Sequence, residues 1–167
     1  MKTDSNDQIS FEGIPAALLA EFPTLRVSYD ALRARYSGEL DKPWFVTAVV
    51  SDVLGPYLDS LLIEGDEDRD LRRVMGFIER LASHPDVNVR GVVATELAYP
   101  LFGPGREELL ERARLFMGPA TLDLLSDQER LATRAPMGLL DRLSLPILRR
   151  RNKVRVLHGR NERRQGR

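Results

Sequence analysis

The spacing of apolar residues constrains the fold of this chain more than any other feature of its sequence. Leu25, Tyr29, Leu32 and Tyr36 follow one another at steps of four, three and four, which is the period of one helix face. No window shows the strict two-residue alternation that is typical of a half-exposed strand. We therefore predict an all-α protein, a bundle of six or seven helices.

The most apolar segment, Trp44 to Ile63, has the length of a membrane-spanning helix but carries two acids. Asp52 and Asp59 would be costly in hydrocarbon, so we interpret the segment as a buried core helix and expect no membrane span. Gly55 and Pro56 interrupt it. Because proline removes a backbone donor and its ring clashes one turn back, we expect a kink or a break there.

Caps and helix breakers give the other boundaries. The acids that follow Gly65, and Asp86 after His84-Pro85, are typical helix starts, and they predict two consecutive helices that form a hairpin. We expect three regions: a disordered N-terminus at 1–13, a helical domain at 14–132 and a basic tail at 133–167.

The formal net charge of zero conceals a strong asymmetry. Met1 to Ser126 carries 13 basic and 21 acidic residues, a net of −8, and Asp127 to Arg167 carries 12 and 4, a net of +8. Three interpretations of the tail stay open: a disordered extension, a contact with nucleic acid or an anionic membrane, or an arm that folds onto the acidic body. For the body itself, binding of nucleic acid is not expected.

The sequence lacks the motifs of common cofactor, metal and catalytic sites. It has no cysteine, which excludes disulfides, thiolate zinc sites and thiol nucleophiles and favours a cytoplasmic location. The two histidines, His84 and His158, have no second histidine three or four residues away. No phosphate-binding glycine loop and no Gly-x-Ser-x-Gly elbow is present. We expect no cofactor, no metal and no catalytic residue of a familiar kind.

One acidic run imitates the first half of a calcium loop. Asp66, Asp68 and Asp70 fit its first three positions, but Leu71 stands where glycine is needed and Phe77 where a bidentate glutamate is needed. We interpret these acids as residues that favour the start of a helix.

Glu96 is the carboxylate that the sequence marks most clearly. It lies seven residues after Val89, so at about 100° per residue it points along the apolar face of its helix. A buried carboxylate needs a partner, and we predict that Glu96 is a buried structural carboxylate, bonded to a basic or hydroxyl side chain of a neighbouring helix.

Two stretches of the chain carry a resemblance to known proteins. The run His84-Pro85-Asp86-Val87-Asn88-Val89-Arg90, with Leu97 after it, resembles the second helix of a HEAT-type repeat. The order of Leu-Ala-Glu-Phe-Pro, a long core helix, Thr95-Glu96-Leu97 and Gly118-Pro119 resembles small uncharacterised bacterial all-helical proteins. Some proteins of that kind are immunity proteins encoded beside toxins. The resemblance implies one HEAT-like helical hairpin and an immunity-like role, and the preference for arginine over lysine fits a GC-rich bacterial genome.

Two classes of function stay open at this point. The first is a non-catalytic adaptor or immunity-like module that binds a basic protein through an acidic surface made of Asp66, Glu67, Asp68, Asp70, Glu107, Glu108 and Glu111. The second is an enzyme whose site is assembled from scattered carboxylates such as Asp52, Asp59 and Glu96. We favour the binding module, because it needs none of the missing motifs. The sequence does not indicate an oligomeric state.

Overall fold

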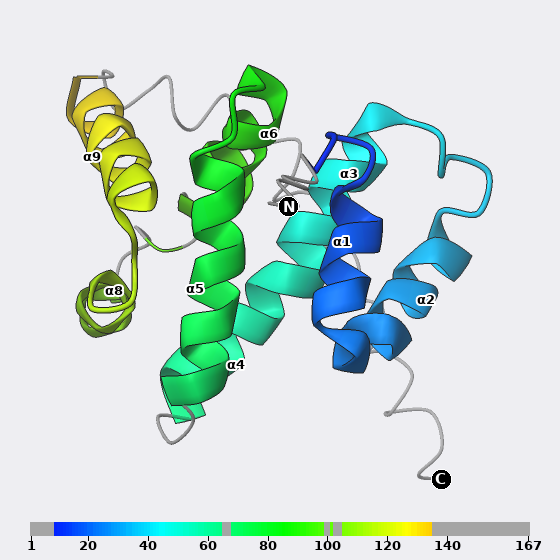
Figure 1. The fold of residues 1–167 in the computed structure, drawn as a ribbon, viewed down its shortest axis with the longest axis horizontal. Coiled ribbons are helices and arrows are strands. Elements are labelled where there is room, and N and C mark those ends of the chain that lie inside the picture. The colour runs from blue at the N-terminus through cyan, green and yellow to red at the C-terminus, as the bar shows by residue number, and fades with distance from the viewer. Residues whose placement is uncertain (1–8, 65–67, 99–100, 102–104, 135–167) are drawn as a thin grey trace, which may run out of the picture. The chain divides into compact units, whose positions relative to one another are not determined.

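The computed structural model of the chain describes residues 9–64, 68–98, 101 and 105–134. It divides into two units, residues 1–128 and 129–167, and the description below concerns the first. The prediction of an all-α fold is confirmed, because the described residues form seven helical rods and no strand (Figure 1). The predicted basic tail lies outside the described residues, except that the last helix reaches Arg134.

Helix α1 spans Ile14–Glu21, and after the short turn η1, Pro23–Leu25, helix α2 spans Arg26–Arg35. Ile9 and Phe11, which we assigned to a disordered N-terminus, pack against the core ahead of α1. The Ser10 hydroxyl, by accepting from the Gly13 N–H at 3.1 Å, holds the turn that leads into α1. Residues 9–13, before the predicted boundary at residue 14, therefore already belong to the packed structure, because apolar side chains in this turn have a core to contact.

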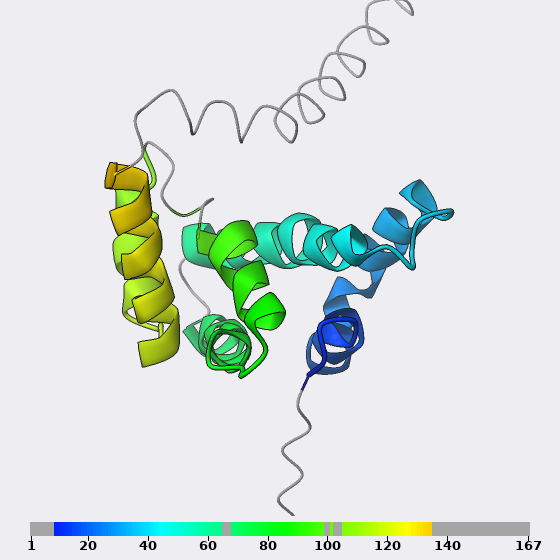
Figure 2. The ribbon, with the colours of Figure 1, turned by 90° about the horizontal axis from the view of Figure 1, so that it is seen from above.

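The central rod consists of α3, Pro43–Val49, then the π-helical turn η2, Val50–Leu54, and α4, Gly55–Glu64. Of the predicted kink or break at Gly55 and Pro56, the break does not occur, and the helix is instead distorted there by a π-helical turn. The Gly55 N–H donates to the Val50 carbonyl five residues back, which widens the turn just before Pro56, and the helix runs on. In Figure 2 the rod lies across the view, whereas α1 and α5 are seen end-on.

The rod contributes many apolar side chains to the core. Among the described residues it is the one helix that is long and apolar enough to cross a membrane, a property that the core helix of a soluble protein shares. Its buried side chains are Phe45, Val46, Val49, Val50, Val53, Leu54, Leu58, Leu61 and Leu62. They pack in one cluster with α1, α5 and α6, as predicted for a core helix.

Helix α5 spans Asp68–Ala82, and α6, Val87–Val92, continues into a second π-helical turn, η3, Val93–Ala98. Asp86 caps α6 as predicted, by accepting from the Asn88 N–H at 2.8 Å. Arg90 donates to the carbonyls of His84 and Pro85, at 2.6 and 2.8 Å, in the connection that follows α5. These bonds fix the connection between α5 and α6.

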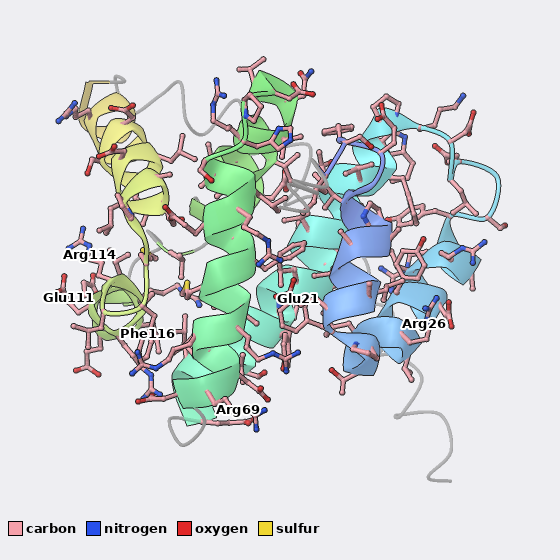
Figure 3. All side chains as sticks on the ribbon, in the orientation of Figure 1. Glu21, Arg26, Arg69, Glu111, Arg114 and Phe116 are labelled. Atoms are coloured by element: carbon pink, nitrogen blue, oxygen red, sulfur yellow. The ribbon has the colours of Figure 1, made fainter. Side chains whose placement is uncertain are left out.

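Arginines of α5 hold the end of α1. Arg73 donates to the Glu21 carbonyl at 2.9 Å and lies over the Phe22 ring, and Arg80 forms an ion pair with the Glu21 carboxylate. Figure 3 shows Glu21 between α1 and α5. Cations at the C-terminal end of a helix also interact favourably with its dipole.

Helix α8 spans Glu107–Arg114 and α9 spans Pro119–Arg134. The start of α9 is bound by Glu79 of α5. The Glu79 carboxylate accepts from the backbone N–H groups of Ala120 and Thr121, at 2.9 and 3.0 Å, and from the Thr121 hydroxyl at 2.7 Å. A Cβ atom at Gly118 would come within 2.3 Å of the Glu79 side chain, so a larger residue fits only if Glu79 moves and its bonds to α9 are disturbed.

Gly118→Ala is expected to destabilise the protein by about 1 to 3 kcal/mol, the cost of forcing a packed group aside. Gly76→Ala is the matched control, because nothing lies within 4 Å of a Cβ atom at this position inside α5. It is expected to stabilise the protein by up to about 1 kcal/mol through helix propensity. Urea unfolding measures both free energies, and equal effects of the two substitutions would contradict the steric argument.

Glu79 also predicts a pH dependence of stability. Burial alone would raise its pKa, but the bonds from Thr121 and Ala120 outweigh burial and hold the pKa below the ordinary value of 4.5. A carboxylate with a lowered pKa stabilises the fold above the unfolded-state pKa, and this contribution disappears as the pH falls through the folded-state pKa. Glu79→Gln is expected to lower the free energy of unfolding by about 1 to 2 kcal/mol at pH 7. The difference from the parent chain should shrink below pH 4.5. A difference that stays constant to pH 2 would show that the charge is irrelevant.

Candidate functional site

The predicted acidic surface is only partly free to bind a partner. Asp66 and Glu67 lie outside the described residues, and Glu107 and Glu108 are exposed on the first turn of α8. The other three acids face arginines of the same chain: Asp68 and Arg112 at 3.4 Å, Asp70 and Arg73 at 3.4 Å, and Glu111 and Arg114 at 2.7 Å.

The contact between Arg112 and Asp68 joins α8 to the start of α5, so acids from these two distant segments share one part of the surface. Figure 3 shows Glu111 and Arg114 together on α8. Because arginines stand between the acids, much of the local negative charge is compensated. This surface is weaker as a cation site than its count of acids suggests.

Asp59 differs from the other two carboxylates that we proposed for an enzyme, because it has an arginine partner. It forms an ion pair with Arg106 at 2.5 Å, and both side chains are partly buried. This pair joins α4 to the segment that leads into α8, a structural role. The structure thus removes Asp59 from the set of scattered carboxylates and leaves Asp52 and Glu96.

Asp52 and Glu96 belong to two π-helical turns that pack against each other. Asp52 lies in η2 and is exposed, and Glu96 lies in η3 and is half-buried. Each accepts a hydrogen bond from the hydroxyl just before it in the chain: Ser51 donates to Asp52 at 3.1 Å, and Thr95 donates to Glu96 at 3.2 Å. We predicted a partner for Glu96 on a neighbouring helix, but its bonded hydroxyl belongs to its own helix.

This carboxylate pair, Asp52 with Glu96, lacks a cation among the residues that the structure describes. Burial raises the pKa of Glu96 above its ordinary value, the Thr95 hydroxyl opposes this shift, and the negative charge of Asp52 adds to it. Desolvation and a like charge both disfavour a second ionised group. A cation bound beside Asp52 and Glu96 would offset the repulsion between their negative charges.

A shallow groove of about 330 Å³ adjoins Asp52. Its walls come from η1, α2 and the central rod, and they combine the Asp52 carboxylate with hydroxyl groups and apolar side chains. The lining residues are Thr24, Leu25, Ser28, Asp52, Val53, Pro56 and Tyr57. The groove therefore combines hydrogen-bond acceptors with apolar side chains, which suits a ligand side chain with a charged end and an aliphatic stem.

The two turns share a local sequence pattern that our sequence analysis missed. In each, a hydroxyl residue directly precedes an acid, and the acid stands four residues before a proline, Pro56 or Pro100. In an α-helix the proline ring would strike the carbonyl of that acid. An acid four residues before a proline, inside an apolar helix, is the signal that could have located both carboxylates.

The described residues contain no group of three or more His, Cys, Asp or Glu side chains that could hold a metal ion. Asp68 and Asp70 stand in the first turn of α5, where we predicted acids that favour a helix start. His84 belongs to the connection after α5, where its Nδ1 accepts from the Asp86 N–H at 3.0 Å. His158 lies outside the described residues.

The pKa of Glu96 predicts the effect of neutralising it. A raised folded-state pKa means that ionised Glu96 opposes folding at neutral pH, and that this penalty vanishes as the pH falls below the unfolded-state pKa. Glu96→Gln is expected to stabilise the protein at pH 7 by about 0.5 kcal/mol, the scale of partly exposed charge interactions, and to have no effect at pH 3. Urea unfolding at both pH values measures this. If Glu96→Gln instead destabilised the protein at pH 7, the result would support the structural partner for Glu96 that the sequence predicted.

Comparison with known proteins bears on the family alone. No curated protein and no solved structure matches the chain. The model of one family, described as a domain of unknown function (DUF7674), matches residues 15–131. This match begins in α1, ends in α9, and includes both π-helical turns and the groove beside them. Since it covers more than half of the sequence, the chain belongs to the DUF7674 family.

Proposed function

We propose that this chain is a non-catalytic protein-binding module that receives a basic side chain of a partner protein at the carboxylate pair and the adjoining groove. One observation carries the proposal: η2 and η3 pack against each other, the charge of Asp52 acts on Glu96, and no arginine, lysine or histidine among the described residues forms an ion pair with either acid. The chain neutralises Asp59, Asp68, Asp70 and Glu111 with its own arginines.

The electrostatics of the pair favour a cationic ligand. Half-burial and the charge of Asp52 both make ionised Glu96 unfavourable, and a bound guanidinium or ammonium would reverse both effects. A guanidinium presents several N–H donors in a fixed plane, so it can bond carboxylate oxygens from two elements at once. Arginine is therefore the side chain that this site fits best.

The groove supplies the rest of the recognition. Leu25, Val53 and Pro56 form apolar walls for the aliphatic stem of the incoming side chain, and the hydroxyls of Thr24 and Ser28 can accept its remaining donors. A volume of about 330 Å³ suffices for one long side chain and its flanking backbone.

The net charge of residues 1–126 favours a partner protein that is basic as a whole. A net of −8 speeds the encounter with a basic protein and disfavours nucleic acid. The exposed Glu107 and Glu108 contribute to this field at long range. A basic toxin encoded beside this chain is one partner of the right charge, which keeps the immunity-like role within the proposal.

A second candidate function rests on the same pair. A carboxyl with a raised pKa beside an ionised carboxylate is the arrangement that general acid–base catalysis uses. An enzyme would lose turnover on Asp52→Asn or Glu96→Gln without losing affinity for its substrate, whereas a binding module would lose affinity.

The proposal predicts where a basic peptide binds. Titration of the isotope-labelled chain with an arginine-rich peptide is expected to shift amide resonances of η2, η3 and the start of α2. Asp52→Asn and Glu96→Gln together should weaken binding at least about tenfold, and added salt should weaken it further.

Asp70→Asn with Glu111→Gln is the matched control, because it removes the same amount of charge from acids that already pair with arginine. Its effect is expected to be small. If the peptide shifts resonances of α8 and of the start of α5 instead, the surface predicted from the sequence is the site and the carboxylate pair is not. If it shifts none, the binding proposal is wrong.

A further inference from the structure

The outward face of α5 carries a row of arginines. At about 100° per residue, positions 69, 72, 73, 76 and 80 point in nearly one direction, and all of them are exposed, whereas the opposite face of α5 is buried. Figure 3 shows Arg69 at the start of this helix. We call this face the arginine row, and it consists of Arg69, Arg72, Arg73, Gly76 and Arg80.

The arginine row has the opposite sign to the unit that carries it. Residues 1–126 hold 13 basic and 21 acidic residues, and four of the basic ones lie on this one helix face. The acids of α5 are turned to its flanks, where Asp68 faces Arg112 of α8 and the Glu79 carboxylate accepts bonds from the start of α9. Solubility is served by charges of both signs interspersed, so a face of one sign needs another explanation.

Aromatic rings hold three of the four guanidinium groups in place. A guanidinium that is stacked on a ring keeps its N–H edge available for a carboxylate. It also loses less conformational freedom when it binds, because its position is already restricted. The distances from the guanidinium carbon to the ring centroid are 5.0 Å for Arg72 and Phe116, 5.4 Å for Arg73 and Phe22, and 5.4 Å for Arg80 and Phe77.

The arginine row has hydrogen-bond donors that the chain does not use. Arg69 and Arg72 form no ion pair with any residue that the structure describes. Arg73 and Arg80 bond to neighbouring acids and to one carbonyl, but a guanidinium has further N–H groups beyond those that these bonds occupy. The row can therefore bind several carboxylates at once without losing its internal bonds.

The geometry of the row favours a second helix as its ligand. From Arg69 to Arg80 the axis of α5 rises by about 16 Å, and a helix laid alongside has the same pitch, so carboxylates one turn apart stay in register with the row. Nothing lies within 4 Å of a Cβ atom at Gly76, in the middle of the row. A glycine there allows the backbone of the ligand to approach α5 closely.

Nucleic acid fits the row less well. Single strands bind to proteins largely by stacking their bases on accessible aromatic rings. Phe22 and Phe77, which lie beneath arginines of the row, are buried, and Phe116 is partly buried under Arg72. Beyond the row, the net charge of −8 on residues 1–126 repels a long chain of phosphates.

From these observations we propose that the arginine row is a second interaction surface, which binds an acidic helix of a partner protein with carboxylates about one turn apart. The carboxylate pair belongs to η2 and η3 and the row belongs to α5, so the two surfaces accept ligands of opposite charge. The proposal for the row does not rest on the function proposed for the pair, and either can fail alone.

A synthetic peptide tests the row. The probe is an alanine-rich peptide of about 20 residues, long enough to form a helix in water, with glutamate at every fourth position. Titration of the isotope-labelled full chain is expected to shift amide resonances of α5 around Gly76. A control peptide of the same composition, with its glutamates spread around the helix, should bind there at least about fivefold more weakly. Because residues 127–167 are also basic, affinity is measured from the α5 resonances alone.

Substitutions in the chain separate the row from net charge. Arg69→Gln with Arg72→Gln should weaken binding of the peptide at least about tenfold. Arg33→Gln with Arg35→Gln is the matched control, because it removes the same charge from exposed arginines of α2. Arg33 also lies over a ring, 5.8 Å from the centroid of Tyr29, as Arg72 lies over Phe116. The control pair is expected to change affinity by no more than about twofold, the effect of distant charges.

A third variant places an acid inside the row. Gly76→Glu meets no neighbour within 4 Å of its Cβ atom, so the chain should stay folded while the shifts in α5 disappear. The proposal is overturned if the peptide shifts only resonances of residues 127–167, or if the two arginine pairs have equal effects. It is also overturned if an oligothymidine strand shifts the α5 resonances at a lower concentration than the peptide, since the row would then be a nucleic-acid site.

Discussion

A proline inside a buried helix is the constraint on which the central part of this structure depends. Pro56 has no N–H to donate, and its ring would strike the Asp52 carbonyl in a regular α-helix. The π-helical turn η2 accommodates this proline. In it the Gly55 N–H donates to the Val50 carbonyl five residues back, and the helix continues to Glu64. The wider turn changes the direction of Asp52 relative to the rest of the rod. Since η3 has the same form and packs on η2, the two turns that carry Asp52 and Glu96 lie against each other, and the charge of Asp52 acts on Glu96.

Arginines pair with several other acids of the described residues, but none of them pairs with Asp52 or Glu96. Arg73 and Arg80 bind the end of α1, Arg106 binds Asp59, and Arg112 joins α8 to α5. In each case a guanidinium ties together segments that are distant in sequence. The carboxylate pair receives no such cation among the described residues, although each of its acids is held by a neighbouring hydroxyl. An arrangement that leaves two like charges together opposes folding slightly, and natural proteins keep such costs mainly where function uses them.

Local sequence rules predicted the parts of this fold that depend on local interactions. The helical period, the Asp86 cap and the acids at the start of α5 follow from contacts within a few residues, and all three are present. The bonds between Glu79 and the start of α9 join residues about forty positions apart, so no spacing rule reveals them. The prediction for Glu96 assumed 100° per residue, and the π-helical turn breaks that assumption just where Glu96 lies. The sequence indicated an apolar direction for Glu96 but could not identify its neighbour Asp52.

The π-helical turn η3 joins an apolar side to an acidic side. Val93 and Leu97 line a small apolar gap that Thr121 and Leu125 also line, and Glu96 stands between them in the chain. Packed interiors contain little free volume, and this gap is about as large as one water molecule. The packing of Val93 and Leu97 therefore holds the backbone of η3 in place. Because η3 packs on η2, the same backbone determines where the Glu96 carboxylate stands relative to η2 and the charge of Asp52.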